Sequence, residues 1–186
     1  MKNQSFLHGR TCYLTPLSQT DLSAEYVSWL NDPEVCKYNS HGVYPETQET
    51  VAQYIASVQG SRTSLVFAIR TLRGNIHIGN ASIQSLNYIN RTGEIAILIG
   101  NTSWWGKGIA TEVYELLINY GFQTLNLHRI WSGMTEDNEG MQKVAQKVGM
   151  SLEGTFREAF FKNGVYRNLV YYAILKHEHT KRVRKK

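Results

Sequence analysis

A glycine pair at the start of an apolar-periodic helix constrains this chain more than any other feature of its sequence. The segment SWWGKGIATEVYELLINYGF (103–122) follows the aliphatic run GEIAILIG (93–100), so the pattern predicts a strand, a loop and a helix from about Gly108 to Thr124. A helix N-terminus carries unpaired N–H groups and a partial positive charge, and both attract anions. Gly106 and Gly108 remove side chains that would block those N–H groups. The segment therefore predicts either a phosphate cradle or a tight turn whose glycines serve packing.

Two common phosphate-binding motifs do not account for this segment. A Walker loop requires Ser or Thr after its lysine, whereas Lys107 is followed by Gly108. A dinucleotide fingerprint requires a third glycine where this chain has Thr111, and an acidic residue near the end of the next strand, which RIWSG (129–133) does not offer. A cradle here would be of another type, with Lys107 adding positive charge at its rim.

The composition predicts one ordinary globular domain. The chain has 186 residues, of which 42% are hydrophobic and 19% charged, and this is enough to bury a core. No apolar run approaches the roughly 20 residues of a membrane span, and MKNQSFLHGR lacks the apolar stretch of a secretory signal. Cys12 and Cys36 form neither a CxxC motif nor a Cys/His cluster, so neither a disulfide framework nor a metal site is expected. We therefore expect a cytoplasmic protein without membrane contact.

The order of the periodic segments predicts an α+β sandwich around a mixed sheet. Thr20 or Ser18 is expected to cap the first helix, and Asn138 the last. The predicted strands are 11–17, 64–70, 76–86, 93–100, 129–134, 151–161 and 165–175, and the predicted helices are 22–32, 46–58, 108–124 and 138–148.

WGKGIA (105–110) resembles the acetyl-CoA loop of the GNAT superfamily of N-acetyltransferases. It matches that family's [Q/R]xxGx[G/A] pattern at Gly108 and Ala110, with Trp105 in place of the usual Gln or Arg. The likeness extends through LHRIWSGMTEDNEG and KVGMSLEGTFRE, which resemble the RimJ/RimL branch. It implies one N-acetyltransferase domain over residues 8–176, followed by a basic C-terminal tail over 177–186.

The resemblance also implies a fold and a cosubstrate. The expected fold is a mixed, mostly antiparallel seven-stranded sheet with flanking helices, in which the central strands 93–100 and 129–134 splay apart. Acetyl-CoA would lie between these strands, with its pantetheine on main-chain groups and its pyrophosphate on the helix N-terminus, and Asn138 could both cap its helix and contact CoA. The implied cofactor-binding residues are Leu98, Ile99, Gly100, Trp105, Gly106, Lys107, Gly108, Ile109, Ala110, Thr111, Asn138 and Lys143.

Acetyl transfer requires a neutral amine, a stabilised oxyanion and a departing thiolate. The main-chain N–H of Ile99 is a candidate donor to the oxyanion. The positions at which relatives carry an acidic Tyr or Ser hold Ala145 and Met141, but a thiol of pKa about 8.5 leaves without much help. Glu94, acting directly or through water, and His41 are the candidate bases. The alternatives are a solvated strand-end carboxylate and an exposed loop histidine.

The acceptor amine is less constrained. The loop YNSHGVYP (38–45) and the turn around FFKNGVYR (160–167) are expected to wall the acceptor site. Branch similarity implies a protein N-terminal amine, with a ribosomal protein as the leading case, and an amino sugar on a nucleotide-sugar is the alternative. A polyamine is disfavoured because a chain of net charge +5 without acidic clusters repels a polycation. The candidate acceptor-binding residues, each of which could also be an ordinary surface residue, are Trp29, Tyr38, Asn39, Ser40, Tyr44 and Arg167.

The basic C-terminus leaves a further possibility open. Five of the last seven residues are Lys or Arg, which is typical of a solvated tail or of a weak contact with RNA or the ribosome. A non-catalytic CoA-binding or RNA-associated module is therefore the second alternative to an enzyme. The sequence is also compatible with a homodimer.

Overall fold

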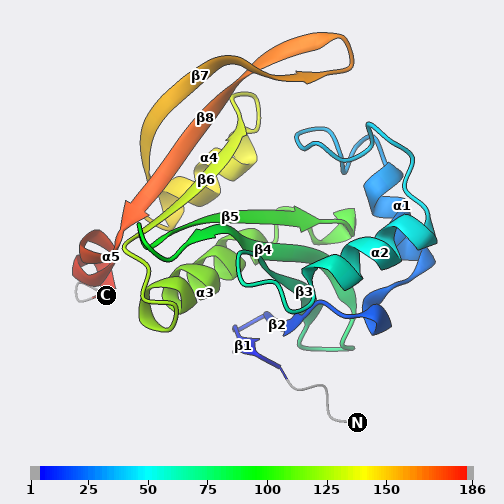
Figure 1. Ribbon diagram of the computed structural model, residues 1–186, viewed down its shortest axis with the longest axis horizontal. Coiled ribbons are helices and arrows are strands. Elements are labelled where there is room, and N and C mark those ends of the chain that lie inside the picture. The colour runs from blue at the N-terminus through cyan, green and yellow to red at the C-terminus, as the bar shows by residue number, and fades with distance from the viewer. Residues whose placement is uncertain (1–4, 184–186) are drawn as a thin grey trace.

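The computed structural model describes residues 5–183 and shows a mixed sheet covered by helices on both faces (Figure 1). The strand order is β1-β2-β3-β4-β5-β6-β8-β7, and β5–β6 is the parallel pair. The strands are β1 (Leu7–His8), β2 (Cys12–Pro16), β3 (Leu65–Thr71), β4 (His77–Asn87), β5 (Thr92–Ile99), β6 (Arg129–Thr135), β7 (Ser151–Lys162) and β8 (Val165–Leu175). The helices are η1 (Gln19–Asp21), α1 (Ala24–Asn31), α2 (Gln48–Val58), η2 (Thr102–Trp104), α3 (Ile109–Gln123), α4 (Glu139–Lys147) and α5 (Lys176–Val183).

The α+β fold class is confirmed, with two local differences. The sheet has eight strands rather than seven, because the two-residue β1 pairs with β2. The predicted cap of the first helix is wrong, since Ser23 caps α1 by accepting a hydrogen bond from the Tyr26 N–H at 3.1 Å. Ser18 instead donates its own N–H to the Asp21 carboxylate at 2.8 Å. The short helix η1 lies between Ser18 and the α1 cap Ser23.

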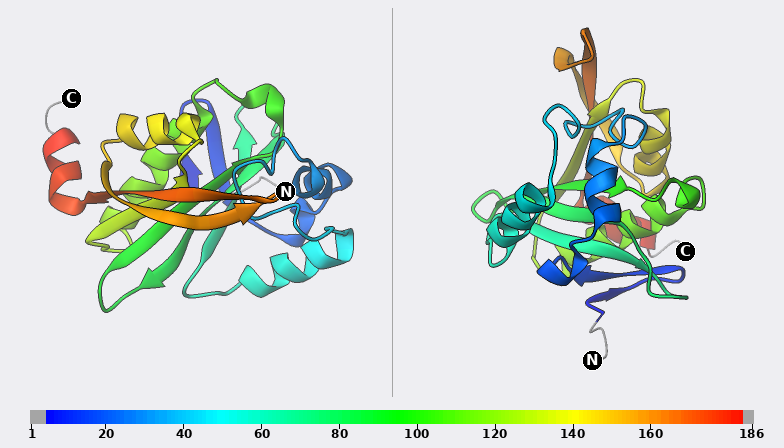
Figure 2. Two further views of the ribbon diagram at one scale, coloured as in Figure 1. Left: turned by 90° about the horizontal axis from the view of Figure 1, so that it is seen from above. Right: turned by 90° about the vertical axis from the view of Figure 1, so that its right-hand side faces the viewer.

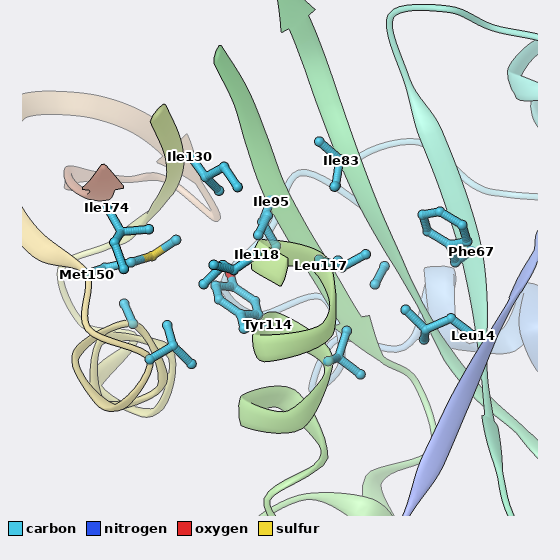
Figure 3. Packing of buried hydrophobic residues seen from close by; sticks show 14 of the residues in the cluster. Leu14, Phe67, Ile83, Ile95, Tyr114, Leu117, Ile118, Ile130, Met150 and Ile174 are labelled. Atoms are coloured by element: carbon cyan, nitrogen blue, oxygen red, sulfur yellow. The ribbon is translucent and has the colours of Figure 1, made fainter. Parts of the chain in front are cut away.

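Two apolar clusters lie on opposite faces of the sheet. Helices α3 and α4 cover the larger cluster, in which Tyr114, Leu117 and Ile118 of α3 pack toward Ile83 and Ile95 of the central strands (Figure 3). Helices α1 and α2 cover the smaller cluster on the other face, and Figure 2 shows α2 and α4 on opposite sides of the sheet. Each helix buries one apolar face in this way, and the sheet is covered on both sides.

Strands β5 and β6 diverge after a short region of pairing. Thr92 to Glu94 pair with Arg129 to Trp131, after which β5 continues beside β4 and β6 continues beside β8 (Figure 1). The opening is closed on the α3 side by Tyr114, whose hydroxyl lies 2.9 Å from that of Ser132. The splayed central strands expected from the family resemblance are therefore present.

The C-terminal basic segment is helical as far as the structure describes it. Residues Lys176–Val183 form α5, where His179 is buried and the Arg182 guanidinium donates to the Lys147 carbonyl. The last three residues, 184–186, lie outside the described residues, and the RNA contact stays a prediction. Between residues 5 and 183, no helix combines the length and the apolar character that a membrane span requires.

Candidate active site

A slot of about 720 Å³ occupies the opening between the diverging strands. We call this cavity the slot. Its walls come from the end of β5, the loop that follows it, the first turn of α3, the length of α4, and the loop after α1. Of the predicted cofactor-binding residues, it is lined by Leu98, Ile99, Trp105, Gly106, Gly108, Ile109, Ala110, Thr111, Asn138 and Lys143. The structure thus brings together residues that are far apart in the sequence.

The turn between β5 and α3 presents bare main chain to the slot. Gly106 and Gly108 have φ angles of +71° and +82°, in the left-handed region that favours glycine. A Cβ atom at either position would meet nothing within 4 Å. Among residues 5–183, no acceptor pairs with the main-chain N–H groups of residues 106–111. These glycines pack against nothing, so the cradle is favoured over a packing turn.

Main-chain hydrogen bonds define which groups of β5 face the slot. The Gly100 N–H donates to the Ile78 carbonyl of β4 at 3.0 Å, so it is not free for a ligand. On the opposite edge, the Ile99 carbonyl accepts the Trp105 indole N–H at 2.8 Å, which fixes the loop against the strand end. The main-chain N–H and C=O groups of successive residues in an antiparallel strand point to opposite edges of the strand. Those of Ile97 and Ile99 therefore point toward the slot, whereas those of Leu98 point toward β4.

This alternation corrects the expected backbone contacts. Ile97, which the sequence analysis did not single out, replaces Leu98 and Gly100 as a main-chain group exposed to the slot. Leu98 still lines the slot, and its side chain packs against the smaller apolar cluster. The sequence pattern could not define this parity, because it depends on which edge of β5 pairs with β4.

Trp29 is a core residue rather than an acceptor-binding one. Its side chain is 5% exposed, packs against the ring of His77 and lies outside the slot. A Cβ built on Gly100 would approach the indole Cδ2 to 2.0 Å, so the absence of a side chain at Gly100 makes room for Trp29.

The Gly100→Ala variant is expected to lose about 1–3 kcal/mol of unfolding free energy, because an added methyl group overpacks the Trp29 site. Urea unfolding followed by tryptophan fluorescence measures the change. Gly154→Ala is the matched control, since a Cβ there meets nothing within 4 Å and Gly154 also lies in a strand. Equal midpoints for the two variants would contradict the packing role of Gly100.

The lysines around the slot differ in whether their ammonium groups already contact another side chain. Lys107 lies over the Trp104 ring, with Nζ 5.0 Å from the ring centroid, and does not line the slot. Lys143 lines it, but its ammonium lies 3.3 Å from the Glu139 carboxylate in an exposed ion pair. Lys147 also lines the slot and has no carboxylate partner within the described part of the chain.

Asn138 is confirmed as the cap of α4. Its side-chain oxygen accepts the Met141 N–H at 3.2 Å, and the same residue lines the slot. Within residues 5–183, the side-chain amide nitrogen of Asn138 donates to no acceptor. Asn138 can therefore cap α4 with its oxygen and contact a ligand with its nitrogen.

A side pocket of about 430 Å³ adjoins the slot on the α1–α2 face of the sheet. We call this cavity the side pocket. Asn39, Ile97 and Leu98 line both cavities, so the two meet near the C-terminal end of β5. Glu46 contributes a carboxylate to the lining of the side pocket. Most of the other polar lining groups are hydroxyls, side-chain amides and tyrosine rings. The side pocket therefore suits a second reactant of mostly uncharged character, bound next to the ligand of the slot.

A row of polar side chains leads from the side pocket to Glu94. The Ser82 hydroxyl donates to the Gln84 side-chain carbonyl at 3.3 Å, and the Gln84 amide donates to the Glu94 carboxylate at 3.2 Å. Ser82 and Gln84 line the side pocket, whereas Glu94 lies just beyond it. Burial raises the pKa of the Glu94 carboxyl above its usual value, although the hydrogen bonds from Gln84 and Ser85 oppose this shift, so the group is suited to accept a proton.

His41 lines the side pocket from the loop after α1. The residue is exposed, but partial desolvation lowers the pKa of its imidazole, Glu46 opposes this shift, and the nearby Lys162 charge adds to it. The imidazole is therefore neutral near pH 7 and able to accept a proton.

The other predicted acceptor-binding residues separate into two groups. Tyr38 lines the slot, Asn39 lines both cavities and Tyr44 lines the side pocket. Ser40 is exposed outside both cavities. Arg167 also lines neither cavity, although its Nε donates at 2.9 Å to the carboxylate of Asp137, which lines the slot.

Tyr54 and Glu46 are two side-pocket residues that were not singled out from the sequence. Tyr54, on α2, occupies a position typical of helix core, and Glu46 precedes α2 as an ordinary polar residue. A helical periodicity alone cannot distinguish an aromatic side chain that packs from one whose edge lines a cavity.

Glu112, in the GIATE segment, has a structural role. Its carboxylate is buried and accepts hydrogen bonds from the main-chain N–H groups of Arg10 and Thr11, the latter at 3.1 Å. It therefore fixes the turn between β1 and β2 onto α3. Within residues 5–183, no group of three His, Cys, Asp or Glu side chains is placed to hold a metal ion.

The family model of the acetyltransferase (GNAT) domain matches residues 12–151, the segment that contains the cradle, β5 and α4. The chain belongs to the GNAT acetyltransferase family. The fold is similar to that of a RimL structure, described as a ribosomal L7/L12 alpha-N-protein acetyltransferase in complex with CoA. That match has a TM-score of 0.81 at 20% identity and covers 90% of this chain and 95% of the other.

Two relatives of this GNAT chain are a spermidine acetyltransferase and an uncharacterized N-acetyltransferase. The spermidine N(1)-acetyltransferase of Escherichia coli K12 is 34% identical over 101 residues, and the alignment covers 54% of each chain, so this chain spans about half the length of that relative. The uncharacterized N-acetyltransferase YnaD of Bacillus subtilis is 30% identical over 161 residues, with 85% of this chain and 89% of YnaD covered.

Proposed function

We propose that the protein transfers the acetyl group of acetyl-CoA to a primary amine, and that this amine is the N-terminal α-amine of a peptide or protein. The observation that carries the proposal is the meeting of two cavities at Ile97 and Leu98, one beside unpaired main-chain N–H groups and one lined mainly by uncharged polar groups.

The slot suits acetyl-CoA. The N–H groups of residues 106–111 would bind the pyrophosphate, with Lys147 adding positive charge nearby. The main chain of Ile97 and Ile99 would bond the pantetheine arm in the manner of an added strand. Such binding places the thioester toward the junction with the side pocket. The slot volume lies within the range of about 300–1,000 Å³ usual for small-ligand sites.

The side pocket would hold the acceptor amine beside the thioester. Glu94 is too far along β5 to line the pocket, so we infer that it removes the amine proton through water held near Ser82 and Gln84. The neutral amine attacks the thioester carbonyl, a main-chain N–H of Ile97 or Ile99 stabilises the oxyanion, and the thiolate leaves. The thiolate, from a thiol of pKa about 8.5, needs little acid assistance, which fits Ala145 and Met141 at the family's acid positions.

The charge of the side pocket supports an α-amine over a polyamine. Glu46 is its carboxylate, and it already accepts the Thr50 hydroxyl at 2.6 Å, while the net charge of +5 disfavours a polycation. An α-amine has a pKa of about 7.7–8.0 and is substantially neutral near pH 8, so one carboxylate acting through water suffices. An amino sugar on a nucleotide-sugar is the second candidate, favoured by the hydroxyl and amide groups of the lining.

Thiol release from acetyl-CoA tests the proposal. Short peptides with free N-termini, the same peptides with blocked N-termini, spermidine and amino-sugar nucleotides are compared at equal concentration. The free peptides are expected to give the highest kcat/KM, and the blocked peptides none. Faster release with spermidine would contradict the acceptor class, and release with none of the amines would contradict the transferase.

A further inference from the structure

We propose that Lys162 is a positioning residue that fixes the acceptor side of the site, an inference that rests on the proposed function. Its ammonium ties the loop between α1 and α2 to the far end of the β7–β8 hairpin. The loop lies 126 residues from Lys162 at Cys36, and Figure 1 shows the end of the hairpin reaching over that loop.

The Lys162 side chain is buried and its hydrogen-bonding capacity is filled by main chain. The residue is 7% exposed, and Nζ donates to the carbonyls of Cys36, Asn39 and His41 at 2.6, 2.9 and 2.5 Å. An ammonium group has three N–H donors, and three carbonyls converge on it. Within the described residues no carboxylate forms an ion pair with Lys162, so its charge acts on the loop backbone.

The backbone that Lys162 holds carries residues of both cavities. Tyr38 lines the slot, Asn39 lines slot and side pocket, and His41 lines the side pocket. This stretch belongs to no helix or strand, so side-chain contacts take the place of a hydrogen-bonded ladder in fixing it. At its start, the Cys36 thiol donates to the Trp29 carbonyl at 3.3 Å, which ties the loop to the core. Lys162 supplies the second tie, on the solvent side.

Hairpin geometry determines where the ammonium lies. Lys162 pairs with Val165 across a two-residue turn, Asn163-Gly164, whose φ angles of +52° and +78° are those of a tight hairpin turn. Residues Phe161 and Tyr166 beside the turn are exposed, whereas Lys162 is buried. The turn therefore directs one polar side chain inward, onto the loop, from an otherwise solvated hairpin end.

Removal of the ammonium should act on the acceptor more than on CoA. Three carbonyls would lose their shared donor, and the loop would open to recover hydrogen bonds from water. The side pocket would lose a wall, whereas the slot would keep its cradle and β5 edge, which come from other elements. The expected signature is a rise in the acceptor KM with little change in CoA affinity.

The test compares Lys162→Met with Arg157→Met, which removes an exposed cation from the same strand. Hydrogen exchange of residues 36–44 reports on the loop, calorimetry on CoA affinity, and steady-state kinetics with the best peptide on the acceptor. We expect Lys162→Met to speed exchange at least 10-fold, to raise the acceptor KM at least 10-fold and to change the CoA Kd by less than about 3-fold, given the usual effect of lost hydrogen bonds at one wall. Arg157→Met should match the wild type in all three.

Lys162→Arg provides a second variant in case Lys162→Met folds poorly. It keeps the charge, but a planar guanidinium cannot direct its donors at three carbonyls around one nitrogen, so intermediate exchange and KM are expected. Unchanged exchange in both variants would overturn the tie, and faster exchange with an unchanged KM would overturn the positioning role. Absence of transfer by the wild type would instead refute the proposed function, while the exchange result would still decide whether Lys162 holds the loop.

Discussion

The Gly108→Trp variant is expected to lose measurable binding of CoA, with a Kd raised at least about 100-fold, equivalent to about 2.7 kcal/mol. Gly108 caps α3 at the mouth of the slot, and a Cβ there would meet nothing within 4 Å. An indole would extend from this point into the space above the N–H groups of residues 106–111. It would exclude the pyrophosphate without displacing any packed residue. Isothermal titration calorimetry with CoA measures the loss.

The backbone cost of this substitution must be separated from its effect on the slot. Gly108 has a φ of +82°, so any side chain there is strained. Gly60→Trp is the matched control, because Gly60 has a φ of +76°, also has an empty surround within 4 Å, and lies at the end of α2 outside the slot. Normal CoA affinity in Gly60→Trp and lost affinity in Gly108→Trp would agree with the cradle. Unchanged affinity in Gly108→Trp would contradict it.

The Glu94→Gln variant is expected to lower kcat/KM for a peptide acceptor about 100-fold at pH 7, since a positioned general base contributes about 10²–10⁴-fold. The amide cannot accept the amine proton, although it preserves the shape and a bond with Gln84. The loss should shrink toward pH 9, where the α-amine is mostly neutral without help. Steady-state rates of thiol release from pH 6 to 9 measure both effects.

The direction of the wild-type profile follows from the Glu94 pKa. Burial raises this pKa, and the active form is the deprotonated carboxylate, so the rate should fall as the pH drops through the raised value. Glu49→Gln, an exposed carboxylate on α2 outside both cavities, should leave the profile unchanged. An equal loss at pH 7 and pH 9 in Glu94→Gln would contradict the role of base.

The order of elements and the cradle could be predicted from the sequence because local patterns define them. Alternating aliphatic residues over 93–100 and a helical period after Gly108 require a strand, a turn and a helix, and the structure has β5 and α3 within one residue of those bounds. Glycines at positive φ are likewise a local requirement. These features depend on neighbours in the chain rather than on the rest of the fold.

Features that depend on tertiary contacts were missed or misassigned. Trp29 was expected at the acceptor, but the absence of a side chain at Gly100 lets it pack in the core. Arg167 was expected there as well, but it pairs with Asp137 at the wall of the slot and lines neither cavity itself. The inward direction of Lys162 depends on the β7–β8 turn meeting a loop more than a hundred residues earlier, a contact without a local sequence signal.

A crystal structure of the protein with CoA tests the central claim most directly. We predict that the pyrophosphate lies against the main-chain N–H groups of residues 106–111 and that the pantetheine runs along the Ile97 and Ile99 edge of β5 toward the side pocket. CoA bound at another surface, or in the slot with its pyrophosphate away from this turn, would contradict the account.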